Sequence, residues 1–169
     1  MDVIKGHREM GGLVGYEFEL THLTDEHARF VVEEWSKVHL SRAAKDESEM
    51  DYVGIVDSDW DRFCAYSQVM ASVEKSVLDT LSPEEIAELK TIYYIGRERL
   101  FSEVYEKHLE GALKAHHLAT SLAGEIRYLM TKTNLLDALA CGVEILGRRR
   151  LAAELRFLRP VLRTAVDFL

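Results

Sequence analysis

Three of the chain's seven histidines and two of its glutamates lie within thirteen residues, "YEKHLEGALKAHH", from Tyr105 to His117. Imidazole and carboxylate groups are preferred metal ligands, but one helix can direct them at one ion only when they are three or four residues apart on one face. At about 100° per residue, His108 lies in the middle of the apolar face of the predicted helix, His116 at its edge and His117 on the polar face. The three imidazoles point in different directions, so the sequence predicts no metal site within this stretch.

His108 has two interpretations. Together with Tyr105, and with acidic or tyrosine side chains from other helices, it could hold a metal or a small molecule. Alternatively, it is a core histidine that bonds to a neighbouring helix. Di-iron bundles use Glu-x-x-His motifs on helices, and this chain has that spacing once, at Glu19–His22, in a segment predicted to be extended. We therefore predict no metal and no cofactor, and name His108 and Tyr105 as candidate residues for an unidentified ligand.

The sequence contains no recognisable catalytic motif. It has no Gly-rich phosphate loop, His-Glu-x-x-His, Cys-x-x-Cys or Gly-x-Ser-x-Gly. Asp57, Asp59 and Asp61 match the first, third and fifth positions of a calcium loop. Arg62 and Gln68, however, replace the glycine and the glutamate that such a loop requires. We predict no catalytic residue and favour a non-enzymatic protein, although distant helices can assemble a site that leaves no local motif.

Positive charge is concentrated at the C-terminal end. Residues 145–169 contain six arginines against Glu154 and Asp167, whereas the other 144 residues contain 15 basic and 27 acidic side chains. On a helix over 148–169, four arginines form one arc and are candidate partner-binding residues: Arg149, Arg156, Arg159 and Arg163. They could contact nucleic acid or an acidic partner, but the acidic body argues against broad nucleic-acid binding. The favoured interpretation is the solvated basic face of a core helix.

Helical periodicity and capping signals predict the elements that position these residues. We expect helices over 23–44, 57–81, 82–96, 97–132, 134–147 and 148–169, the last kinked at Pro160. Ser82, Pro83 and Glu85 give the best helix-start signal in the chain. Val14–Leu20 and Tyr52–Val56 could pair as a short N-terminal β-ribbon, within or after an extended segment over 1–22. The prediction is a single all-α domain over 1–169, a bundle of about five or six helices.

Two seams of small or apolar residues could pair between subunits. In the last helix the seam consists of Leu151, Leu155, Leu158, Leu162, Ala165 and Leu169. In the helix over 97–132 it includes Ala112, Ala115 and Ala119. Both seams could equally pack inside one chain, so a homo-oligomer is only modestly favoured.

Two cysteines and a polar start favour a cytoplasmic protein, and no apolar run is long enough to span a membrane.

The segment "LSPEEIAELKTIYYIGRERL", residues 81–100, resembles a signature of bacterial helical domains of unknown function. In that signature an acidic-capped helix ends with an aromatic or leucine, an aliphatic residue and Gly-Arg, here Tyr94-Ile95-Gly96-Arg97. The resemblance implies a bacterial cytosolic origin and assigns no activity.

These observations leave three hypotheses about function. The first is a self-associating interaction or regulatory protein. The second is a helical bundle that binds a metal or a small molecule through His108. The third is an adaptor that contacts nucleic acid or an acidic partner through its C-terminal arginines.

Overall fold

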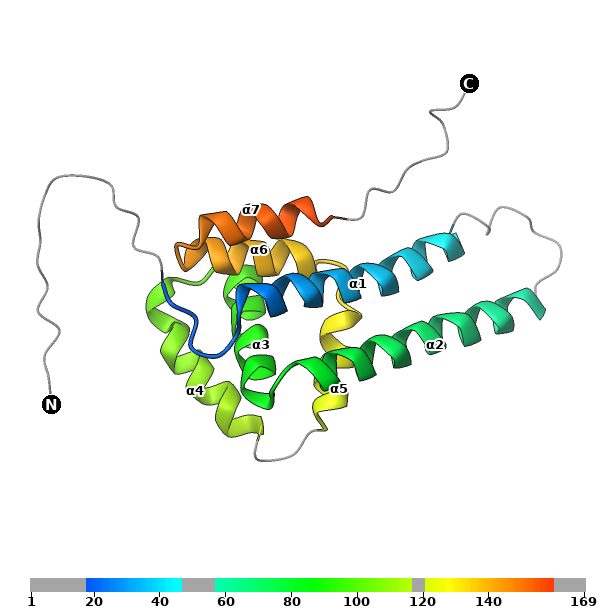
Figure 1. Cartoon of the computed structure of the whole chain (residues 1–169), viewed down its shortest axis with the longest axis horizontal. Helices are drawn as coiled ribbons and strands as arrows, with labels where there is room; N and C mark the ends of the chain where they lie inside the picture. Colours follow the sequence, from blue (N-terminus) through cyan, green and yellow to red (C-terminus); the bar gives the residue numbers. More distant parts are fainter. Residues whose placement is uncertain (1–17, 47–56, 117–120, 160–169) are drawn as a thin grey trace, which may run out of the picture.

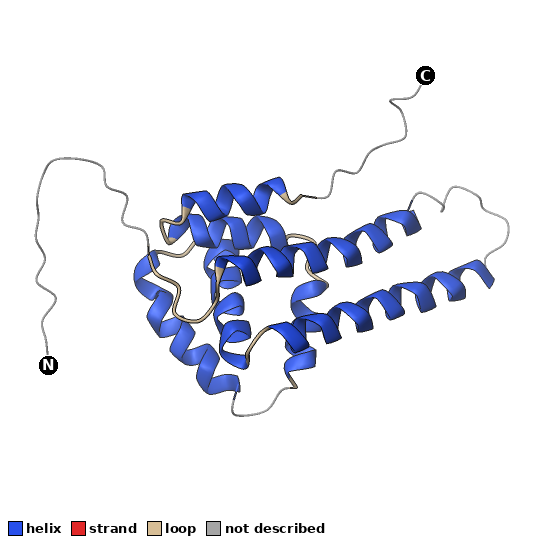
Figure 2. Ribbon diagram, in the orientation of Figure 1, coloured by secondary structure: helices blue, strands red, loops and turns tan. Residues whose placement is uncertain are grey.

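The computed structural model describes residues 18–46, 57–116 and 121–159, and its regular elements are all helices (Figures 1 and 2). The described residues form seven α-helices and one 3₁₀ helix, η1, in this order: α1 (Asp25–Asp46), α2 (Asp57–Thr80), α3 (Pro83–Glu98), η1 (Ser102–Val104), α4 (Tyr105–His116), α5 (Leu122–Met130), α6 (Leu135–Ile145) and α7 (Arg149–Phe157). The predicted all-α bundle is confirmed. None of these helices has an apolar stretch long enough to cross a bilayer.

Helix α3 forms the centre of the bundle, between α4 and α5 and against α6 (Figure 1). Apolar residues recur along it at steps of three, and these residues, Ile86, Leu89, Ile92 and Ile95, are at most 1% exposed. The predicted capping box starts this helix. The Ser82 hydroxyl accepts a hydrogen bond from the Glu85 N–H at 3.2 Å, and the Glu85 carboxylate accepts one from the Ser82 N–H at 2.8 Å.

Two glycines bring α3 and α6 into backbone contact. A Cβ on Gly96 would lie 1.8 Å from the carbonyl oxygen of Ala138, and a Cβ on Gly142 would lie 2.3 Å from that of Ile92. We expected Gly96 to end or bend its helix. Instead α3 continues to Glu98, and Gly96 is needed because the backbone of α6 occupies the place of a side chain.

The predicted helix over 97–132 is wrong as one continuous element. Arg99 adopts the left-handed conformation, φ 51° and ψ 47°, and ends α3, while the Leu100 N–H bonds to the Ile95 carbonyl at 2.9 Å. After η1, the chain forms α4 and α5 as separate helices, which is why the described residues form seven α-helices. The hydrophobic periodicity predicted no break here, because the sequence gives no sign that an arginine will adopt the left-handed conformation.

The N-terminal β-ribbon is not found in the part of the chain that the structure describes. Val14 and Tyr52–Val56 lie outside the described residues, and Phe18 belongs to an irregular segment. The N–H of Phe18 bonds to the carbonyl of Leu146, at the end of α6, at 3.0 Å. The segment that contains Phe18 is therefore anchored to a helix and not to another strand.

The described part of the C-terminal seam packs within the chain. Leu151 and Leu155 are buried against α6 and α1, and Leu158 is half-buried. Pro160 and the rest of the seam lie outside the described residues. The seam is therefore used for core packing as far as it can be followed.

We predict that Gly142→Ala lowers the free energy of unfolding by about 3 kcal/mol, because its Cβ collides with backbone atoms that cannot move aside. Urea unfolding followed by circular dichroism measures this loss. Gly111→Ala in α4 is the matched control, because a Cβ there has no heavy atom within 4 Å. It should stabilise the protein by up to about 1 kcal/mol through helix propensity. Equal effects of the two variants would contradict the backbone contact.

Candidate functional site

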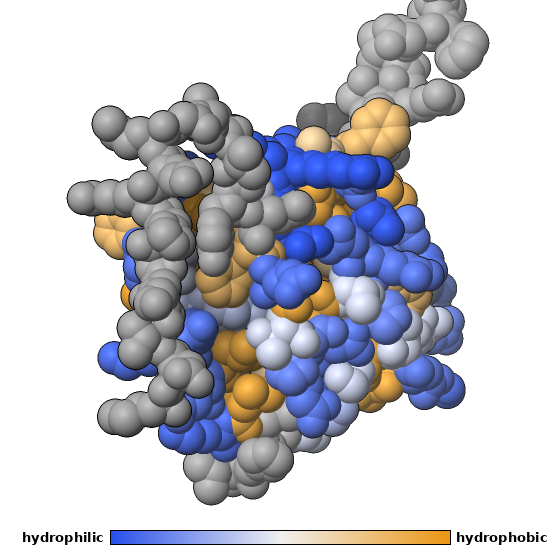
Figure 3. All heavy atoms as spheres, turned by 60° about the vertical axis from the view of Figure 1, so that its left-hand side comes forward, coloured by the Kyte–Doolittle hydropathy of each residue, from blue (hydrophilic) through white to orange (hydrophobic). Residues whose placement is uncertain are grey.

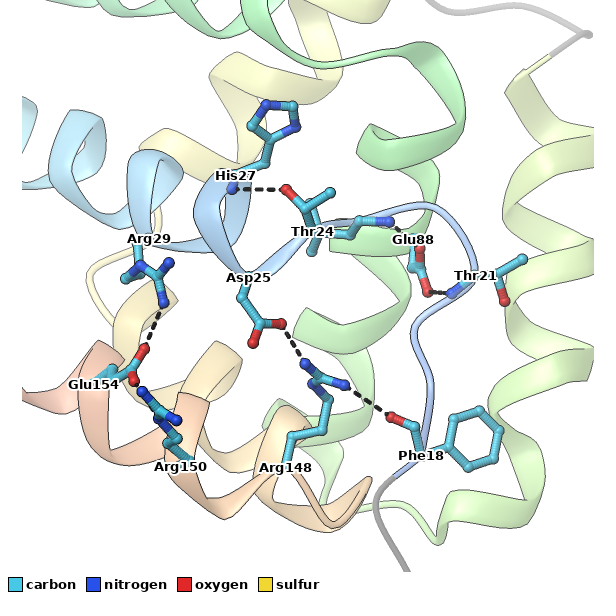
Figure 4. Close-up of polar contacts among 11 residues, drawn as sticks. Phe18, Thr21, Thr24, Asp25, His27, Arg29, Glu88, Arg148, Arg150 and Glu154 are labelled. Atoms are coloured by element: carbon cyan, nitrogen blue, oxygen red, sulfur yellow. Dashed lines mark hydrogen bonds and ion pairs between the residues drawn. The ribbon is translucent and has the colours of Figure 1, made fainter.

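A buried carboxylate joins the segment 18–24 to α3 (Figure 4). Glu88 is 0% exposed. Its oxygens accept hydrogen bonds from the N–H groups of Thr21, His22 and Leu23 at 2.7, 2.6 and 2.5 Å. The hydroxyl of Tyr105, the first residue of α4, donates a further hydrogen bond to Glu88. We call this arrangement the Glu88 clamp.

The Glu88 clamp is structural rather than catalytic. An ionised carboxylate has about four acceptor positions, and three N–H groups and one hydroxyl use them here. Burial and the hydrogen bond to Glu88 raise the pKa of Tyr105 well above its usual range, so its hydroxyl remains a donor. A general base needs a free oxygen within reach of a substrate, and Glu88 has none.

Arg148 holds the other end of the same segment. Its guanidinium donates to the Phe18 carbonyl at 3.2 Å and forms an ion pair with Asp25, in the first turn of α1. A second ion pair, Arg29–Glu154 at 2.5 Å, joins α1 to α7 (Figure 4). These contacts fix where the segment enters α1.

A groove of about 850 Å³ lies between the segment and α4. It is lined by Phe18, Glu19, Thr21, His22, Tyr105, Glu106, Leu109, Glu110, Leu113 and Arg148. Figure 3 turns this side of the molecule forward and shows apolar surface among charged side chains. Two of the charged groups are already paired, Arg148 with Asp25 and Glu110 with Lys114. Tyr105 contributes its ring to this groove, while its hydroxyl is engaged by Glu88.

His108 does not lie in the core, so the core interpretation is wrong. Its side chain is exposed and lines a separate hollow with Lys90 and Tyr94 of α3. The error follows from the broken helix. The prediction continued one apolar face from Phe101 through His108, but Phe101 lies before α4 and is itself 78% exposed. The structure therefore places the two candidate ligand residues, His108 and Tyr105, in different hollows. Ligand binding at either residue stays a prediction.

The predicted arginine face is largely paired with α6. Arg156 forms an ion pair with Glu144, and Arg159 with Asp137. The hydrogen bond from Arg156 holds the pKa of Glu144 below its usual value, even though partial burial acts in the opposite direction. Arg149 is exposed and Arg163 lies outside the described residues. A partner contact through these arginines stays a prediction, and the ion pairs of Arg156 and Arg159 are with acids of the same chain.

Sequence reasoning missed an exposed aromatic pair on α2. Trp60 and Phe63 have the spacing of core-facing residues in the predicted helix over 57–81, but they are 66% and 57% exposed, with ring centroids 5.9 Å apart. On α1, Leu40 is also exposed, at 46%. The signal that could have found them is helix length, since α1 and α2 are longer than α5, α6 and α7, against which they pack besides each other.

No protein-family model, curated protein or solved structure matches the chain. The class of protein therefore rests on the fold and on these surfaces: an all-helical bundle whose most buried polar group is used for architecture.

We predict that Glu88→Gln lowers the free energy of unfolding by about 3 kcal/mol, because an amide cannot accept all four hydrogen bonds and places its own N–H groups against N–H donors. Tyr105→Phe removes one donor to the carboxylate and should cost about 2 kcal/mol. Chemical unfolding of each variant measures both losses.

Glu106→Gln is the matched control, because it makes the same chemical change on an exposed residue beside Tyr105. Its effect should stay within about 0.5 kcal/mol. A loss in Glu88→Gln no larger than in this control would show that the clamp does not stabilise the fold.

Proposed function

We propose that this protein is a non-enzymatic interaction protein that self-associates through the free end of its α1–α2 hairpin. The observation that carries the proposal is the stacked and exposed pair Trp60 and Phe63. Large exposed aromatic side chains are typical of interface centres, where their burial gives much of the binding energy.

The two halves of α2 differ in what they bury. From Met70 onward the helix buries Met70, Val73 and Val77, at 5%, 1% and 0% exposure. Before Met70, none of its described side chains is buried, although Trp60, Phe63 and Val69 are apolar. Helices in proteins owe most of their stability to packing of an apolar face. The first half of α2 therefore has the composition of a packed helix and, within the described chain, little to pack against.

The shape of the hairpin favours a second copy of the chain as its partner. The two helices are antiparallel, pack against each other and extend beyond α3–α7 (Figure 1). Two such hairpins related by a twofold axis would form a four-helix arrangement in which each supplies the same apolar residues. One identical surface then covers the aromatic pair on both subunits.

This surface differs from the seams that the sequence favoured. The C-terminal leucines pack internally as far as they are described, and Ala115 of the alanine seam is exposed on α4. The proposal retains self-association and moves it to α2. It also places the protein in the cytoplasm of a bacterium, which suits two half-buried free thiols, Cys64 and Cys141.

We predict that the wild-type chain is a dimer at micromolar concentration and that the double variant Trp60→Glu, Phe63→Glu is a monomer, because four carboxylates would meet in the dimer interface. Size-exclusion chromatography with light scattering measures the mass of each. Circular dichroism should show unchanged helix content, since both side chains are exposed.

Phe101→Glu is the matched control, because Phe101 is even more exposed but lies before η1, away from the hairpin end. This variant should remain dimeric. A monomeric wild-type chain, or a dimer that survives the double substitution, would refute the proposed interface.

A further inference from the structure

The hollow that contains His108 lies between two helices and has a volume of about 310 Å³. Its lining comes from α3 (Lys90, Thr91 and Tyr94) and from α4 (Lys107, His108, Gly111 and Ala112). This volume is at the lower end of the range for small-molecule pockets.

Gly111 keeps this hollow open. A glycine inside a helix costs about 1 kcal/mol relative to alanine, and a packing contact usually explains it. Gly96 and Gly142 have such a contact, whereas a Cβ on Gly111 would have no heavy atom within 4 Å. Its missing side chain leaves free space on the α4 side of the hollow.

Tyr94 provides a fixed aromatic wall. Its hydroxyl donates to the Tyr128 hydroxyl at 3.4 Å, and the Arg97 guanidinium carbon lies 4.8 Å from the centre of its ring. The hydrogen bond to Tyr128, together with partial burial, raises the pKa of Tyr94 to about 12. The ring is therefore neutral at physiological pH and is held in place by side chains outside the hollow.

The basic side chains around the hollow are not all paired with acids. Lys90 forms an ion pair with Glu125 at 2.9 Å. Lys107 and His108 are exposed, and neither has an ion-pair partner among the described residues. The hollow therefore combines a mostly apolar lining, one aromatic ring and a positive edge.

We propose that this hollow binds a small aromatic acid. The flat apolar part of the ligand would lie against Tyr94 and the open surface at Gly111, and Lys107 and His108 would hold its carboxylate. The apolar lining suits an apolar body, and the unpaired ammonium of Lys107 suits the single negative charge, to which the imidazole of His108 can add an N–H donor. This site is independent of the hairpin interface and does not require self-association.

Benzoate is the probe for this site, with benzyl alcohol as its uncharged counterpart. We expect benzoate to cause saturable shifts in the ¹H–¹⁵N spectrum of the full chain, confined to Lys90–Tyr94 and Lys107–Ala112. Benzyl alcohol should bind about tenfold more weakly, because it lacks the negative charge that the Lys107 ammonium holds. No saturable shift with benzoate, or equal shifts with both compounds, would overturn the proposal.

Two variants locate the ligand. Gly111→Ala should weaken benzoate binding about tenfold while the helix stays folded, since its methyl group occupies the space of the ring. Lys107→Glu should weaken it to a similar degree by reversing one charge. Lys114→Glu on the same helix is the control: Lys114 pairs with Glu110 and does not line the hollow. Unchanged binding in Gly111→Ala, or equal losses in the two lysine variants, would show that benzoate binds elsewhere.

Discussion

The burial of the Glu88 carboxylate is the constraint on which the rest of this structure depends. A buried charge is costly unless donors surround it, and here the donors come from segments more than 60 residues earlier and from the start of α4. Meeting that requirement fixes the segment 18–24 between α3 and α4. The segment in turn delivers Asp25 to Arg148 and starts α1 beside α7. One side chain on the central helix thus sets the positions of three other elements.

This use of polar groups affects where function can lie. Glu88, Tyr105 and Arg148 are buried or nearly buried groups that could have done chemistry, and all three are engaged in holding the chain. Among the features available on the surface are the aromatic pair at the hairpin end and the hollow beside Lys107 and His108 on α4. Both are features of binding rather than of catalysis, which is consistent with an interaction protein.

Local features were predictable from the sequence, and contacts across long separations were not. The Ser82–Glu85 capping box and the all-helical fold follow from residues within one or two turns. The helix break at Arg99 depends on a left-handed backbone that arginine rarely adopts. The hydrophobic pattern therefore predicted one continuous helix across Arg99, and that helix placed His108 wrongly in the core. In the sequence, Glu88 cannot be told from any other acid on an amphipathic helix, because its hydrogen-bond partners come from distant parts of the chain. Trp60 and Phe63 have the spacing of core residues, and only the length of the hairpin shows that the core does not reach them.

Amide hydrogen exchange of the intact wild-type chain tests the central role of Glu88 most directly. The N–H groups of Thr21, His22 and Leu23 belong to a segment without regular secondary structure. Amide hydrogens in such segments ordinarily exchange fast. If the carboxylate holds them, they exchange as slowly as core amides of α3 such as that of Ile92, through opening of the whole domain. Fast exchange at these three positions, beside a protected α3, would contradict the claim that this clamp organises the fold.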